Sequence, residues 1–201
     1  MKRLLLILTL TFSFQSLSNA DDIRDFEIEG MSIGESLLEY VQLKTIKKSR
    51  RYNYNSNRFY TLDLILDKFT NYYAVQVHLK KDDMSYQIHG LSGAIKFGKA
   101  AVYYPKSKNE CKKQMYIIEN EIDKIFSNSD KEKSGEYIGQ GDYDPKAIRD
   151  EIYYTVNTGE IYLQCVTWSK KVKKKENLFD SLRVSIMNNK FSYWLSNEAY
   201  K

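Results

Sequence analysis

Two cysteines and two histidines are the residues best suited to chemistry in this chain of 201 residues. A pair of cysteines forms a structural disulfide in a chain that meets an oxidising compartment. Because the N-terminal segment described below predicts export, we expect Cys111 and Cys165 to be bonded to each other. The alternative is a thiolate at Cys111, in the first turn of a helix, which would serve catalysis or redox sensing and would need a histidine as its base.

The histidines, His78 and His89, lie eleven positions apart in segments that alternate like β-strands. Helical metal sites place their ligands three or four positions apart, a spacing that these two residues do not have. We therefore predict ordinary histidines on a sheet. The sequence assigns no catalytic residues, no metal site and no cofactor.

Two glycine-containing segments match ligand-binding or catalytic loops only in part. In the segment 90–94 (GLSGA) the second glycine comes one position too early for the nucleophile turn of hydrolases, and strand residues follow it. We expect a bend or bulge in a sheet at Gly90. The segment 139–144 (GQGDYD) lacks the Lys-Ser/Thr pair of a phosphate loop and the ligand spacing of a calcium loop, so we expect a surface loop.

A run of lysines forms the second candidate site, in a segment expected to connect two strands. Five of six consecutive residues are lysines: Lys170, Lys171, Lys173, Lys174 and Lys175. One interpretation is a solvated connecting loop. The other is a mobile anion-binding loop that contacts lipid head groups or an acidic partner. The 17 tyrosines of the chain also suit binding surfaces, because tyrosine gives a large contact area at a low entropy cost.

The first twenty residues have the organisation of a signal peptide. Lys2 and Arg3 precede the apolar run 4–14, and small residues at Ser18 and Ala20 precede a polar chain that starts at Asp21. The run is too short to cross a bilayer of about 30 Å as a helix. We expect cleavage after Ala20 and export to the periplasm or the medium, the alternative being an uncleaved N-terminal anchor.

The remaining residues, 21–201, are expected to form one α+β domain, because no linker rich in Pro, Gly or Ser divides them. Alternating apolar residues predict a mostly antiparallel sheet from the segments 58–66, 73–79, 86–97, 151–156, 160–169 and 182–186. A long helix is predicted over residues 108–126, and we expect it to pack on the sheet through the apolar stripe Cys111, Met115, Ile118, Ile122 and Ile125. A long loop is expected over residues 127–150.

Short helices are predicted near both ends of this domain. Ser32 and Glu35 have capping-box spacing, which predicts a helix from Ile33 to about Val41, with a restart through Leu43 and Ile46. Asn188 or Asn189 is expected to cap a last helix whose residues Phe191, Trp194 and Leu195 face inward.

The mature chain resembles, over its whole length and most strongly at its two ends, a family of small exported proteins of unknown function that is associated with streamlined marine alphaproteobacteria. The sequence segments that carry the resemblance are DFEIEGMSIGESLL at residues 25–38, LRVSI at 182–186 and WLSNEAY at 194–200. The resemblance implies an exported globular protein. It implies no activity and no site.

Charge and hydropathy restrict the possible partners. Without Lys2 and Arg3 the formal net charge falls from +5 to +3, and the signs are interspersed, so we predict no nucleic-acid partner. After residue 20 no apolar run approaches the length of a transmembrane helix. The sequence therefore favours an exported, non-enzymatic protein that binds an envelope component or a macromolecular partner. A small periplasmic hydrolase or thiol enzyme is the alternative.

Overall fold

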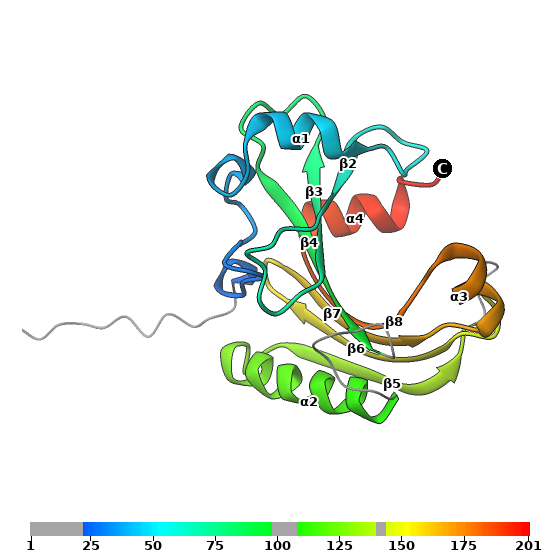
Figure 1. Cartoon of the computed structure of the whole chain (residues 1–201). Coiled ribbons are helices and arrows are strands. Elements are labelled where there is room, and N and C mark those ends of the chain that lie inside the picture. The colour runs from blue at the N-terminus through cyan, green and yellow to red at the C-terminus, as the bar shows by residue number, and fades with distance from the viewer. Residues whose placement is uncertain (1–21, 98–107, 140–143) are drawn as a thin grey trace, which may run out of the picture.

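The computed structural model describes residues 22–97, 108–139 and 144–201. Within these ranges one curved antiparallel sheet of eight strands, in the order β1-β2-β3-β4-β8-β7-β6-β5, forms the centre of the molecule (Figure 1). The strands are β1 (Arg50–Arg51), β2 (Phe59–Leu64), β3 (Ala74–Lys80), β4 (Ile88–Phe97), β5 (Asp130–Ile138), β6 (Ile148–Val156), β7 (Gly159–Thr167) and β8 (Asp180–Asn188). The predicted α+β class and the antiparallel sheet are confirmed.

The helices of the described ranges are short except for one. They are α1 (Leu43–Ser49), α2 (Lys108–Ile125), α3 (Lys170–Glu176) and α4 (Asn189–Asn197), with the 3-10 turns η1 (Ile23–Asp25) and η2 (Leu37–Glu39). None of them is both long and apolar enough to cross a membrane.

One face of the sheet is buried in a large hydrophobic core. Every second residue of the central strands points into this core, as Leu91 and Ile95 do in β4. The same cluster of buried side chains contains Ile28 and Leu37 of the N-terminal segment and the apolar stripe of α2. This face is therefore closed to solvent by residues from well separated parts of the sequence.

The opposite face carries α4 and a smaller aromatic cluster. Asn188 accepts a hydrogen bond from the backbone N–H of Phe191 and so caps α4, as the sequence predicts. Phe191 and Trp194 of α4 are buried against Phe59 of β2. The aromatic contacts fix α4 on one end of this face.

The predicted bulge lies beside Gly90. His78 of β3 pairs with Gly90 and the next residue, Leu79, pairs with Ile88, so His89 is the extra residue of β4. A Cβ at Gly90 would lie 3.0 Å from the Phe191 ring, so this close contact with α4 favours glycine.

The predicted helix over residues 33–41 is wrong. The Glu35 carboxylate does accept a hydrogen bond from the Ser32 N–H at 2.8 Å, as in a capping box, but only the 3-10 turn η2 follows. The reason is competition from β-type hydrogen bonds. The N–H groups of Gly34 and Leu37 donate to the carbonyls of Ile88 and Tyr86. The predicted restart through Leu43 and Ile46 is confirmed, because α1 begins at Leu43.

The loop expected over residues 127–150 is also wrong, because it contains strand β5. This strand lies at the edge of the sheet, and its residues are exposed except for the partly exposed Tyr137. Lys131 of β5 forms ion pairs with Glu119 and Asp123 of α2. An exposed edge strand needs no apolar alternation. Its charged side chains protect it against pairing with a strand of another chain.

Candidate functional site

The two cysteines form a disulfide, which confirms the predicted pair. The bond joins Cys111 of α2 to Cys165 of β7, with 5.9 Å between their Cα atoms. Both residues are buried, and the described part of the chain contains no free thiol. The thiolate proposed as the alternative at Cys111 is therefore not available in this state.

The two histidines are buried in the face that carries α4. His78 Nδ1 lies 3.0 Å from the Tyr54 hydroxyl, and His89 Nδ1 lies 3.0 Å from the Asn188 amide. Burial, together with the positive charge of Arg183, lowers the pKa of His78 to about 3. Burial is also the main reason why the pKa of His89 is below its ordinary value. In the described ranges no group of three His, Cys, Asp or Glu side chains is placed to hold a metal ion.

The lysine run forms a helix, α3, and the expectation of a loop is wrong. Ser169 caps the helix by accepting from the Val172 N–H, and Asn177 ends it in the left-handed conformation with φ 52°. Lysine is a good helix former, so the run that suggested a solvated connector also supports a helical turn.

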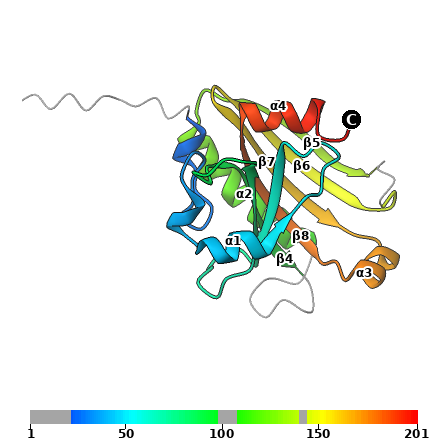
Figure 2. The ribbon, with the colours of Figure 1, turned by 90° about the horizontal axis from the view of Figure 1, so that it is seen from above.

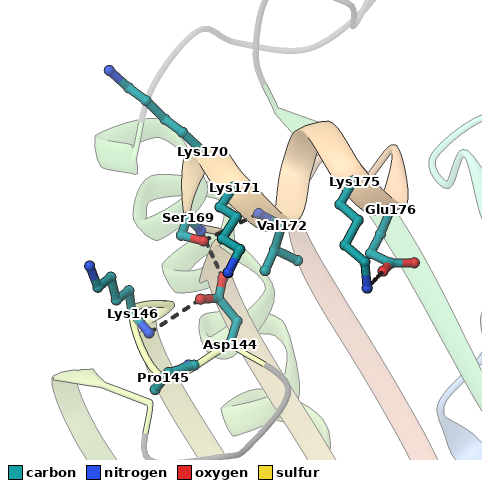
Figure 3. A pocket seen from close by; sticks show the side chains of 9 residues that line it. All are labelled: Asp144, Pro145, Lys146, Ser169, Lys170, Lys171, Val172, Lys175 and Glu176. Atoms are coloured by element: carbon teal, nitrogen blue, oxygen red, sulfur yellow. Dashed lines mark hydrogen bonds and ion pairs between the residues drawn. The ribbon is translucent and has the colours of Figure 1, made fainter.

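A cleft of about 810 Å³ lies between α3 and the end of the connection into β6 (Figure 3). Its lining combines part of the lysine run with a second segment, residues 144–146, which the sequence did not associate with the run. The lining residues are Asp144, Pro145, Lys146, Ser169, Lys170, Lys171, Val172, Lys175 and Glu176. The Lys170 side chain extends away from Asp144 in Figure 3.

Asp144 holds the two sides of the cleft together. Its carboxylate accepts hydrogen bonds from the backbone N–H of Ser169 at 2.8 Å and of Lys146 at 3.2 Å. Burial opposes the ionisation of Asp144, but these N–H donors outweigh it and hold the pKa below the ordinary value. The negative charge of Asp144 is thus used to position the backbone at the start of α3.

The five lysines of the run differ in their partners. Lys173 is paired with Asp180 at 2.6 Å, and Lys175 is paired with Glu176 at 2.7 Å. By contrast, Lys170, Lys171 and Lys174 form no ion pair with another described residue. Lys173 and Lys174 do not line the cleft. Of the five lysines predicted to bind an anion, only Lys170 and Lys171 therefore both line the cleft and lack an ion pair within the described ranges.

Lys146 completes this group, and the sequence analysis missed it. It lines the cleft beside Lys170 and Lys171 and likewise forms no ion pair within the described ranges. It is one isolated lysine far from the run in sequence, so no local pattern marked it. We define the basic cleft by these three residues, Lys146, Lys170 and Lys171.

Of the candidate loop 139–144, residues 140–143 lie outside the described ranges. Its last residue, Asp144, is the carboxylate that organises the cleft. Comparison of the chain with protein-family models, with curated proteins and with solved structures gave no match.

Proposed function

We propose that this is an exported, non-enzymatic binding protein, in the periplasm or outside the cell, which contacts the anionic head groups of an envelope membrane through the basic cleft. The observation that carries the proposal is that Lys146, Lys170 and Lys171 line one cleft and form no ion pair within the described ranges. The N-terminal segment supports export, and the disulfide is compatible with it.

The charges of the cleft favour an anionic partner over a neutral one. Asp144 is engaged by backbone N–H groups, and Glu176 is engaged by Lys175. The cleft is lined by four lysines (the three of the basic cleft and Lys175) and two carboxylates, so its lining keeps a net positive charge. Each lysine near an anionic membrane contributes about 1 kcal/mol, and the attraction fades within a Debye length of about 8 Å at physiological salt. Three lysines then increase the affinity roughly 100-fold.

The test measures binding of the mature chain to vesicles of phosphatidylglycerol mixed with phosphatidylcholine at low salt. The cleft variant carries Lys146→Gln, Lys170→Gln and Lys171→Gln. The matched control carries the same three-charge loss on α1, as Lys44→Gln, Lys47→Gln and Lys48→Gln. We expect the cleft variant to bind roughly 100-fold more weakly and the α1 variant to change by no more than a few fold.

Equal losses in the two variants would mean that net charge alone drives binding, and the proposal would then fail. It would fail equally if the unaltered protein did not distinguish these vesicles from pure phosphatidylcholine. Thermal unfolding of both variants should match that of the parent chain, because none of the six lysines forms an ion pair within the described ranges.

A further inference from the structure

The sheet face that carries α4 is only partly covered by that helix. Figures 1 and 2 show α4 and α3 at different ends of the strands, with a stretch of sheet between them that no described helix covers. We call this stretch the open face. Antiparallel registry places there the outward residues of four adjacent strands: Gln76 of β3, Ser92 and Ala94 of β4, Arg183 and Ser185 of β8, and Tyr162 and Gln164 of β7.

Small side chains form the centre of the open face. Ser92 and Ser185 face each other across β4 and β8, with 2.7 Å between their hydroxyl oxygens, and Ala94 pairs with Arg183. These are central strands of the sheet, where large apolar side chains would normally cover the surface if another element packed on it. The outward side chains of β4 and β8 at this place are therefore small, apart from Arg183.

Arg183 is a cation without a partner on this surface. It is exposed, and no hydrogen bond or ion pair joins it to another described residue. Desolvation by the surrounding protein nevertheless lowers its pKa, against the raising effect of Tyr162 and Asp63. A side chain can reach water and still be surrounded by protein when the sheet curves around it.

The carboxylates near Arg183 are bound by other groups. Asp63 forms an ion pair with Arg51 at 3.2 Å and accepts from the Gln76 amide at 2.9 Å. Glu151 of β6 accepts from the Gln164 amide at 2.6 Å, and the hydroxyl of Tyr162 also donates to it. The guanidinium is therefore left as the one group of the open face whose charge is uncompensated by a contact in the described chain.

The other groups of the open face are aromatic rings and uncharged hydrogen-bonding side chains. Tyr162 of β7 and Tyr153 of β6 contact each other edge to face, with 6.2 Å between ring centroids and 63° between ring planes, and both are partly exposed. Gln76 and the two serines add donors and acceptors. A ligand pocket typically combines such an apolar platform with a few polar groups that fix orientation.

From this arrangement we infer that the open face binds a small acidic sugar, whose carboxylate pairs with Arg183 and whose ring and hydroxyls lie over Tyr162, Tyr153 and Ser92. A guanidinium matches a carboxylate with two parallel hydrogen bonds. A single charge fits better than a phosphate dianion, because one arginine must compensate it next to the carboxylates of Asp63 and Glu151. The site lies on a different surface from the basic cleft and does not depend on the proposed membrane contact.

The test is a calorimetric titration of the disulfide-bonded protein at low salt with glucuronate, with glucose as the uncharged probe and glucose 6-phosphate as the dianionic probe. Glucuronate should bind at least tenfold more tightly than glucose. Arg183→Gln should weaken glucuronate binding tenfold to 100-fold, the range for hydrogen bonds to a charged group, and leave the weak glucose binding unchanged. Arg183→Lys should restore only part of the affinity, because lysine keeps the charge and loses the planar pair of donors.

The matched control is Arg58→Gln, which removes an arginine paired with Glu198 and should not change glucuronate binding. The inference is overturned if no glucuronate binding is seen in the millimolar range, or if glucuronate and glucose bind equally. It is also overturned if Arg183→Gln and Arg58→Gln have the same effect. Tighter binding of glucose 6-phosphate than of glucuronate would overturn the assignment of a single negative charge.

Discussion

Acid should destabilise this fold through one buried side chain, His78. The ring is enclosed between Tyr54, whose hydroxyl is 3.0 Å away, and Phe191, whose ring centroid is at 4.6 Å. Burial and the charge of Arg183 lower the pKa of His78 from the ordinary 6.5 to about 3. The folded state therefore binds fewer protons than the unfolded state between these two values. This contribution to stability is complete above about pH 6.5 and is lost as the pH falls towards 3.

The magnitude follows from the difference between the two pKa values. At about pH 4.5, two units below the ordinary pKa, the unfolded side chain is protonated and the folded one is still neutral. Each unit corresponds to about 1.4 kcal/mol, so the free energy of unfolding should fall by roughly 3 kcal/mol between pH 7.5 and pH 4.5 from His78 alone. Carboxylates contribute to acid sensitivity as well, and a variant is needed to separate the two effects.

Urea unfolding, followed by tryptophan fluorescence at several pH values, measures this contribution. His78→Gln keeps a group that can bond to the Tyr54 hydroxyl and removes the titration, so its stability should decrease with acid by roughly 3 kcal/mol less than that of the parent chain. Tyr54→Phe removes the hydrogen bond but keeps the buried imidazole, so it should retain the parent's pH dependence. If His78→Gln and the parent chain lose the same stability in acid, the assignment to His78 is refuted.

Two further predictions concern cross-links between distant segments. Cys111 and Cys165 are 54 positions apart, so replacing both with serine should lower the free energy of unfolding by about 4 kcal/mol in the chain-entropy treatment; a urea titration that gives less than about 1 kcal/mol would contradict it. Glu29 accepts hydrogen bonds at 2.7 Å and 2.8 Å from the N–H groups of Asn71 and Tyr72, so Glu29→Ala should cost about 2 kcal/mol, whereas Ala at the exposed Glu27 should have almost no effect in the same titration.

Most strands could be predicted because the period-2 pattern records burial on one face. The alternation of Val75, Val77 and Leu79 is a direct consequence of a sheet with one covered face. The same logic fails for β5, since an edge strand with both faces in water carries no such pattern. It also fails near Gly34, where hydrogen bonds to a segment more than fifty positions away decide the backbone against a helix. Local signals predict a structure only where no distant strand competes for the same N–H and C=O groups.

The disulfide could be predicted from two facts, the presence of only two cysteines and the expected compartment, and no geometry was needed. The candidate binding surfaces could be predicted from the sequence only in part. Arg183 alternates with Leu182 and Val184, which predicts that it points away from the core, but not that the carboxylates around it are engaged elsewhere. Lys146 shows the same limit, because only the folded chain places it against Lys170 and Lys171. A charge becomes a candidate for binding when its neighbours in space leave it uncompensated. That property depends on the pairing of strands and helices, so a sequence can show the charge and its direction but not its lack of a partner.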